Sequence, residues 1–306
     1  MIAAALIICA LQGADMQAIK GYWIAEGAVA RKGPEALMVA SVAVEPALRS
    51  WARARVELQA KWGHDGSSFP SAQGLSSLEA ADFRGVGEAW LEIDKGDRLR
   101  LKVGLVDANT EFATSAASSE FANPSLGLSP ALALLPSYPD PAWSANLFAT
   151  LGEPGSVVGV GTYRNPDGTW SAVTQFNAPM GSLQWSVGWV TPMTAESTQR
   201  GAYLIVERPA EDGISPFVTV ASAWEHDMWH VATGFTVPLD VPLDARWGIA
   251  TSALLHDDCG DDTVAEAFIV FRPLPILTIR PDFQVRWAQN EKPSPAALIR
   301  ISLAAM

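Results

Sequence analysis

The sequence predicts an all-β fold, namely a transmembrane antiparallel β-barrel of about 16 strands with one long loop folded inward as a constriction. Three observations lead to this prediction. Apolar and polar residues alternate with a period of two through most of the chain. Turn sequences separate the alternating runs at short intervals. After residue 12, no apolar run approaches the ~20 residues that a membrane-spanning helix needs.

The composition requires an unusual placement of apolar residues. Hydrophobic residues make up 49% of the 306 residues and charged residues only 18%, yet no segment could span a membrane as a helix. Strands with one face toward lipid and one toward water accommodate this content. The 12 tryptophans support the same conclusion, because Trp favours the membrane–water boundary. The net charge of -12 excludes nucleic acid as a partner, since no basic stripe can neutralise phosphates.

The clearest alternation lies near the end of the chain. The run 276–287 reads ILTIRPDFQVRW, with apolar residues at every odd position and polar residues at the even positions 278–286. The runs Ala52–Trp62, Gly87–Ile93, Leu99–Val106 and Leu183–Val190 show the same pattern. Helical spacing would scatter these apolar residues around a cylinder, so strands are expected.

Turn chemistry divides the alternating runs. Asp94–Asp97, Gly152–Gly155, Asn165–Gly168 and Pro179–Gly181 carry the Gly, Pro, Asn and Asp residues of tight hairpins. Eleven further strands are expected at Tyr22–Val29, Ala36–Val44, Ser144–Leu151, Ser156–Arg164, Trp170–Asn177, Gly201–Glu207, Pro216–Trp224, Met228–Val237, Arg246–Leu255, Thr263–Phe271 and Ala296–Ala304. An even antiparallel set of this size leaves an aqueous lumen once it closes.

One long segment, Asn109–Pro141, lacks the alternation and is rich in Pro and Ser. It also carries Phe112, Phe121, Leu135 and Tyr138, which is too apolar a content for a disordered loop. These side chains must pack against something, and a barrel offers its interior. We therefore expect the segment to fold inward and narrow the pore.

Residues 1–18 are expected to form a secretory signal peptide, with cleavage in Gly13–Ala18. Their apolar core is about ten residues long, which is too short to span a membrane. A buried first helix or strand is the alternative. Residues 19–306 are expected to form a single barrel domain. Without Cys9, the mature chain would hold only Cys259, which excludes a disulfide framework and a Cys-based zinc site.

Neither a metal, a cofactor nor a catalytic role is expected. His226 and His230 fit a turn that leads into a strand better than a metal site. Glu88 and Glu92 could in principle act as paired carboxylates, but they share a strand face with Trp90 that barrel patterning already explains. No Gly-rich phosphate loop and no nucleophile elbow occur in the sequence.

Three stretches carry a family resemblance. They are Glu88–Phe112, which includes EAWLE, LRLKVG and DANTEF; Glu120–Pro139, with EFANPSLG and LPSYP; and Glu266–Gln284, with EAF and RPDFQ. Pro242–Gly248 shows a weaker similarity. Together with the strand pattern over roughly residues 50–304, the chain resembles the carbohydrate-selective porin (OprB) family. The resemblance implies a bacterial outer-membrane barrel, surrounded by outer-membrane lipid, through which small neutral sugars diffuse. It leaves monomer and trimer open.

Fourteen residues are candidates for lining the pore or its constriction. Eleven lie on the polar face of their strands, and three lead into the long loop. The candidates are Arg53, Arg55, Glu57, Glu88, Trp90, Glu92, Arg100, Lys102, Asp107, Asn109, Glu111, Arg280, Asp282 and Arg286. Such groups can replace the water around sugar hydroxyls. Alternatively, they form cross-strand ladders that specify nothing. A secreted soluble β-protein that binds glycans and a structural barrel without transport remain alternative functions.

Overall fold

The computed structural model describes residues 19–30, 33–65, 73–127, 135–152, 155–194, 200–209, 213–224, 227–241, 244–256, 260–289 and 291–305. The expected signal peptide, Cys9, His226 and Cys259 lie outside these residues. Within them, no helix has the length and apolar character needed to cross a membrane.

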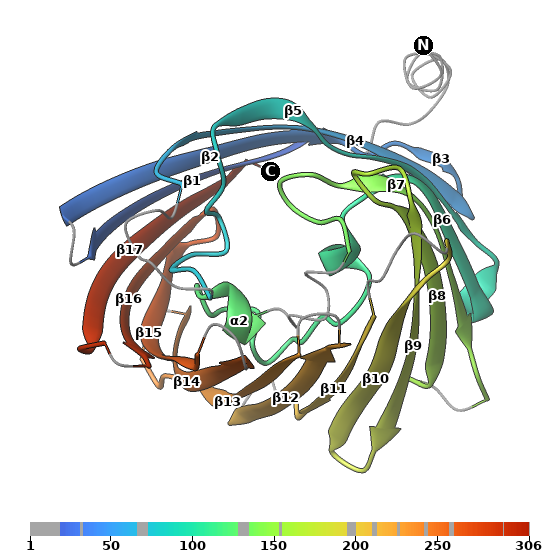
Figure 1. Ribbon diagram of the computed structural model, residues 1–306. Helices are drawn as coiled ribbons and strands as arrows, with labels where there is room; N and C mark the ends of the chain where they lie inside the picture. The colour runs from blue at the N-terminus through green and yellow to red at the C-terminus, as the bar shows by residue number, and fades with distance from the viewer. Residues whose placement is uncertain are drawn as a thin grey trace.

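Almost all regular structure is β-strand (Figure 1). The strands are β1 (Ile19–Ala30), β2 (Gly33–Val44), β3 (Ala47–Arg49), β4 (Ala52–Gly63), β5 (Phe83–Asp94), β6 (Leu99–Val106), β7 (Ala142–Thr150), β8 (Val157–Arg164), β9 (Trp170–Met180), β10 (Leu183–Pro192), β11 (Gly201–Glu207), β12 (Ser215–Ala223), β13 (Met228–Pro238), β14 (Asp244–His256), β15 (Asp262–Leu274), β16 (Leu277–Ala288) and β17 (Ser294–Ala305). The short helices are η1 (Gly96–Arg98), η2 (Ala108–Thr110) and α2 (Pro124–Gly127).

The sheet closes on itself. β1 pairs in antiparallel fashion with β2 on one side and with β17 on the other. The three-residue β3 pairs only with β4 and stays outside the ring, so 16 of the described strands form a closed barrel. This confirms the predicted antiparallel barrel and its strand count. β6 and β11 begin and end where the alternation predicts, whereas β3 lies in a stretch for which no strand was expected.

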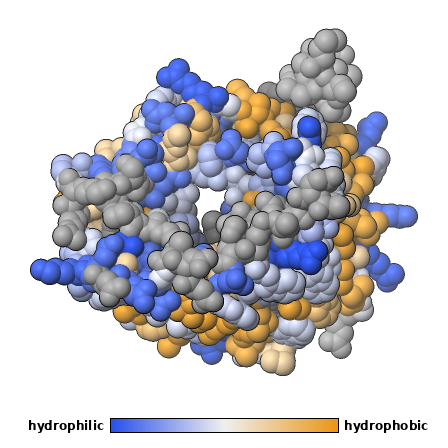
Figure 2. Space-filling model, viewed as in Figure 1, coloured by the Kyte–Doolittle hydropathy of each residue, from blue (hydrophilic) through white to orange (hydrophobic). Residues whose placement is uncertain are grey.

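Alternation along each strand separates lipid from lumen. On β16, Phe283 faces outward and is 51% exposed, whereas its neighbour Gln284 faces inward and is fully buried beneath the loops. Trp23, Trp51 and Trp143 are among the outward-facing aromatic residues. In the space-filling view the outer wall is largely hydrophobic, and hydrophilic residues surround a central opening (Figure 2).

The two ends of the barrel differ in loop length. The end that holds both termini has short turns, such as residues 181–182 between β9 and β10. The opposite end carries the two long connections, residues 64–82 and 107–141. Short turns are typical of the periplasmic end and long loops of the extracellular end. Both long connections turn back into the barrel (Figure 1).

The inward loops cover only part of the inner wall. Phe112 packs with Phe148 and Tyr163 in one buried cluster, and Phe121 packs with Phe217 and Phe268 in another. The described part of the Asn109–Pro141 segment therefore lies inside the barrel, as its apolar content predicts. Leu128, Leu132 and Leu134 lie outside the described residues.

The lipid-facing side should not tolerate charge. We expect Phe283→Lys to lower the free energy of unfolding in liposomes by about 2–4 kcal/mol, because a lysine in mid-membrane loses its hydration. Thr278→Lys, on the inner face of the same strand, is the matched control and should cost far less. Equal losses in guanidinium titrations would contradict the assignment of the two faces.

Candidate pore wall and constriction

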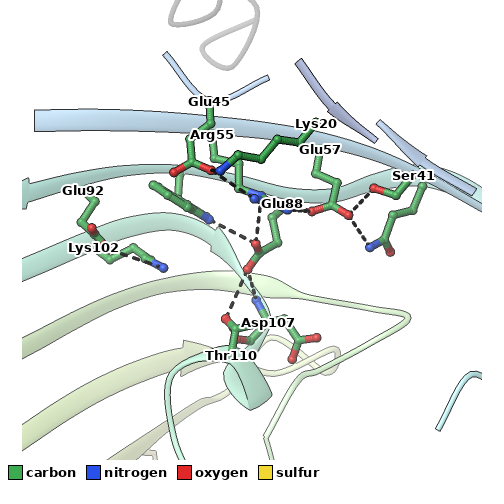
Figure 3. Close-up of polar contacts among 12 residues, drawn as sticks. Lys20, Ser41, Glu45, Arg55, Glu57, Glu88, Glu92, Lys102, Asp107 and Thr110 are labelled. Atoms are coloured by element: carbon green, nitrogen blue, oxygen red, sulfur yellow. Dashed lines mark hydrogen bonds and ion pairs between the residues drawn. The ribbon is translucent and has the colours of Figure 1, made fainter. Parts of the chain in front are cut away.

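The inner faces of β1, β2, β4, β5 and β6 carry a group of charged side chains inside the barrel. The inward loops cover the extracellular end of this wall, where Ala28 and Ala30 of β1 pack with Leu75 and Ala122. Alternation on these strands turns charged side chains inward, and Figure 3 shows them meeting across neighbouring strands.

We call the connected network of ion pairs on this surface the mixed-charge wall. Glu26, Glu35, Lys61 and Asp94 lie on the same inner faces but outside this network. The ten charged members of the network are Lys20, Glu45, Arg53, Arg55, Glu57, Glu88, Glu92, Arg100, Lys102 and Glu111.

Glu92 is the centre of one half of this wall. Its fully buried carboxylate accepts a hydrogen bond from Arg53 Nε at 2.6 Å and another from Arg100 Nη1 at 3.1 Å. Lys102 Nζ lies 3.5 Å from the same carboxylate. Glu111, from the inward loop, pairs with Lys102 and lies 2.8 Å from Arg100 Nη2. The loop therefore continues the charge network that the strands begin.

Arg55 is the centre of the other half. Its guanidinium pairs with Glu57, lies 3.2 Å from Glu45 and lies 3.5 Å from Glu88. Lys20 Nζ approaches Glu45 at 3.6 Å. These partners come from β1, the β2–β3 turn, β4 and β5, so the network fastens four parts of the wall together.

Neutral hydrogen-bonding groups extend this half. Ser41 donates to Glu57, and Gln59 Nε2 donates to the same carboxylate at 2.8 Å. Gln59 Nε2 also lies 3.1 Å from the Tyr22 hydroxyl. Donors and acceptors thus alternate along the wall.

The mixed-charge wall contains five cations and five anions, so its formal charge is zero. Arg53 and Arg100 are two of its exposed cations, with side chains that are 48% and 32% exposed. Glu92 and Glu111, which pair with these arginines, are buried. Lys102 is buried as well, whereas the side chains of Glu45 and Glu88 are partly exposed.

Trp90 lies within this wall but is not free to stack on a solute. Its indole is buried, its Nε1 donates to Glu88 at 3.2 Å, and Lys102 Nζ lies 4.2 Å from the ring centroid. Its strand partner is Gly104, where an added Cβ would lie within 3.0 Å of Trp90. The ring therefore supports the charged groups from behind.

Asp107 holds the two ends of the inward loop together. Its carboxylate accepts hydrogen bonds from Asn109 N at 2.8 Å and from Tyr138 N at 3.1 Å. Burial raises the pKa of Asp107 to about 6, and the charges of Glu88 and Glu57 add to this. Asp107 and Asn109 thus lie at the base of the loop, while Glu111 reaches the mixed-charge wall.

The far wall binds the loop backbone through side-chain acceptors. Gln175 on β9 accepts from Ala113 N at 2.7 Å. Glu207 on β11 accepts from Ser115 Oγ at 2.7 Å and from Ala117 N at 2.9 Å. Glu266 on β15 accepts from Ala122 N and Asn123 N at 2.7 and 2.8 Å. A buried N–H without an acceptor is costly, so these residues fix the path of the loop.

A second inward segment, residues 73–82, was not expected from the sequence. Lys61 is fully buried and donates to Gly63 O at 2.9 Å and also to Ala80 O, which ties the segment to the end of β4. Gln284 Nε2 donates to Leu75 O at 2.9 Å, and Arg300 Nη2 donates to Ser76 Oγ at 2.8 Å. Asn123 Nδ2 donates to Gly74 O at 2.8 Å, which joins the two inward loops.

The three candidate residues of β16 lie apart from the mixed-charge wall. Arg280 is only 6% exposed and donates to Glu120 O beneath the inward loop. Asp282 is buried beside it and accepts from Gln284 Nε2 at 3.2 Å. Arg286 pairs with Asp262 at 3.0 Å and with Glu291 at 3.3 Å toward the extracellular end. Arg280 thus contacts the inward loop, whereas Asp282 and Arg286 pair mainly with neighbouring residues of the wall.

A smaller charge cluster on β14 and β15 was also not predicted from the sequence. Glu120 of the inward loop pairs with Arg272 at 2.6 Å and lies 3.8 Å from Arg246, and Arg272 also lies 3.4 Å from Asp244. The sequence predicted a strand at Arg246–Leu255 without naming Arg246 as a candidate, and no local pattern indicated a contact with Glu120.

His230 lies buried on the inner face of β13, within the strand that was expected to follow this turn. Among the residues that the structure describes, no three His, Cys, Asp or Glu side chains form a group suited to a metal ion.

A closed 16-strand barrel with an apolar exterior, inward loops and a polar wall defines a bacterial outer-membrane porin. Known structures agree with this class. Pseudomonas putida OprB at low pH matches with a TM-score of 0.64 at 13% identity, over 94% of this chain and 92% of that one. An anion-selective porin from Comamonas acidovorans matches with a TM-score of 0.63 at 9% identity, over 94% and 99%. Salmonella typhi OmpF in complex with daunomycin matches with a TM-score of 0.65 at 9% identity, over 94% and 97%.

The family follows from the sequence comparison. The family model "Carbohydrate-selective porin, OprB family" matches residues 47–213, which is more than half of the chain. The chain belongs to this family, and it is an outer-membrane porin for the diffusion of carbohydrates. The Glu266–Gln284 stretch lies beyond the matched range. No curated protein sequence matches the chain.

The acceptor role of Glu207 makes a testable prediction. Glu207→Ala leaves the Ala117 amide without its acceptor, which should weaken the docking of the loop by about 1–3 kcal/mol. We expect a larger mean single-channel conductance with more current fluctuation in planar bilayers. Glu207→Gln, which keeps one acceptor oxygen, should remain close to the parent. Parent-like currents from the alanine variant would show that Glu207 does not hold the loop.

Glu79 should make the second inward segment sensitive to pH. Burial raises the pKa of its carboxyl from 4.5 to about 7, and the charges of Glu26 and Glu35 add to the effect. A raised carboxyl pKa stabilises the folded segment at low pH, and this stability is lost as pH rises from about 4.5 through about 7.

Hydrogen exchange provides the measurement. Amides of residues 75–80, corrected for intrinsic rates, should exchange faster at pH 8 than at pH 5. Glu79→Gln should remove most of this difference. Equal pH dependence in both proteins would assign the effect to another group.

Proposed function

We propose that sugars pass between the mixed-charge wall and the inward loops, and that zero formal charge on this wall suits the channel to neutral solutes. One observation carries the proposal: five cations and five anions form one connected network of ion pairs that joins β1, the β2–β3 turn, β4, β5, β6 and the inward loop. A pore selects through its width, its hydrogen-bonding groups and its field. Paired charges supply hydrogen-bonding groups without a strong electric field of either sign.

The pairing also fixes the groups that a sugar would meet. Arg53 and Arg100 are held by the buried Glu92, and Arg100 also lies over the Phe148 ring at 4.1 Å. Because these side chains are already fixed, they would lose little conformational entropy when their remaining N–H groups bind a sugar.

The alternative is that the same charges only brace a wet wall. The exposure of Arg53 and Arg100 favours the permeation role, since a purely structural ladder has no need to project cations into the lumen. A structural barrel without transport would have the same ladder but no flux. A soluble glycan-binding protein does not fit the apolar outer wall.

We propose further that the solute leaves unchanged. The porin family and fold make the chain a channel, and each candidate carboxylate in the wall is already engaged by a cation. We also propose one pathway per chain, in a monomer or a trimer, because the barrel closes on itself between β1 and β17. One related fold, OmpT of Vibrio cholerae, is known in a trimer form.

Liposome swelling tests the pathway. Liposomes with the parent protein should swell faster in glucose than in gluconate or glucosamine at matched osmolarity. A charged sugar loses part of its hydration in the pore, and a wall of zero formal charge gives no net attraction to offset this cost. Absence of swelling in any sugar would favour a barrel without transport. Equal rates for the three solutes would contradict selection by charge.

Glu92→Gln tests the charge balance directly. It leaves one uncompensated positive charge on the wall, worth about 1 kcal/mol for an ion within 4 Å in water. We expect cation permeability to fall by about fivefold and anion permeability to rise by a similar factor, so that the ratio of cation to anion permeability falls. Glu291→Gln, which removes the same charge at the extracellular rim, is the matched control and should have a small effect. An unchanged reversal potential for Glu92→Gln would remove the wall from the narrow part of the pore.

A further inference from the structure

The outer surface carries an arginine beside a tryptophan at the extracellular end of β4 and β5. Arg84 pairs with Ala60, an outward-facing residue of β4, so its side chain also points outward. Its guanidinium carbon lies 5.5 Å from the centroid of the Trp62 ring, which faces outward two residues further along. Arg84 is exposed.

An arginine and a tryptophan also stand across from each other at two other places at this end of the barrel. Arg164, the last residue of β8, stands directly across from Trp170, the first residue of β9. Arg200 stands across from Trp224, whose N–H donates to Arg200 O at 2.9 Å. In both pairs the two residues continue the outward-facing positions of their strands, and both residues are exposed.

These three arginines differ from most of those inside the barrel. Arg53, Arg55, Arg100, Arg246, Arg272, Arg286 and Arg300 each lie within ion-pair distance of a carboxylate, and the buried Arg280 donates to Glu120 O. Within the described part of the chain, Arg84, Arg164 and Arg200 have no carboxylate partner. Each of these outward-facing strand ends therefore carries an exposed guanidinium that is available to an anionic group.

Their surroundings indicate the edge of the membrane. Further along the same outward faces, toward the middle of the barrel, lie the exposed apolar residues Val86, Val160 and Leu204. Tryptophan favours the level of the lipid headgroups. An arginine beside it, above an apolar strip, therefore lies where the headgroups of the outer leaflet meet the acyl chains.

We propose that the three Arg–Trp pairs are binding sites for phosphate groups on lipids of the outer leaflet. The planar guanidinium can give two parallel hydrogen bonds to a phosphate. The indole packs against the upper part of the acyl chains, and the apolar strip continues that contact. A soluble phosphate would gain only the first of these interactions. The sites would hold the barrel at a fixed depth, independently of what the pore conducts.

The test uses the full-length protein purified in detergent and titrated with lipid A, which carries two phosphates, while bound lipids are counted by native mass spectrometry. We expect the variant Arg84→Gln/Arg164→Gln/Arg200→Gln to bind lipid A about fivefold more weakly at each of the three sites, because each site loses one arginine. Arg49→Gln/Lys95→Gln/Arg98→Gln, which removes three exposed positive charges at the end that holds the termini, is the matched control and should bind as the parent does.

Three results would overturn the proposal. The first is unchanged lipid A binding by the Arg84→Gln/Arg164→Gln/Arg200→Gln variant. Intact sugar-dependent liposome swelling by the same variant would show that it is folded. The second is equal binding of lipid A and its dephosphorylated form by the parent. The third is displacement of lipid A by equimolar inorganic pyrophosphate, which would make the sites general anion sites.

Discussion

The structure depends on closure of the hydrogen-bond ladder between β1 and β17, which pairs residues from Gly21↔Ala305 to Val29↔Ala297. In hydrocarbon, each unpaired N–H or C=O costs several kcal/mol, and an open sheet would leave two edges of them. Closure removes both edges. It also gives every strand a lipid-facing side and a lumen-facing side, so the period-two pattern of the sequence is the direct consequence of this one constraint.

Closure of 16 strands creates more interior space than the wall side chains fill. The loops enter that space, and their backbone groups then need partners of their own. Gln175, Glu207 and Glu266 accept from one inward loop, and Lys61 donates to the other. Polar residues of the inner wall therefore do two different things: some fasten loop backbone, and others face water. The pore is the region left to the second group.

This division explains what the sequence could predict. Alternation located the strands and placed Arg100 and Arg280 on the inner face, because face depends only on position along a strand. Alternation could not tell which of these two arginines is exposed. Arg100 is 32% exposed in the lumen, whereas Arg280 lies beneath Glu120. That difference arises from contacts across more than a hundred residues. Lys61 likewise looked like any polar wall residue, and Glu45 lies in a turn without a periodic signal.

The net charge of the chain and the field of its pore are therefore separate quantities. The chain carries -12, yet the ten charged residues of the mixed-charge wall sum to zero. Charges beyond about 10 Å are largely screened at moderate salt, so a solute in the pore responds mainly to the nearest groups. Arg53 and Arg100 are exposed among those groups, and their partner Glu92 is buried. Pairing between neighbouring strands, rather than overall composition, therefore sets the formal charge of this network.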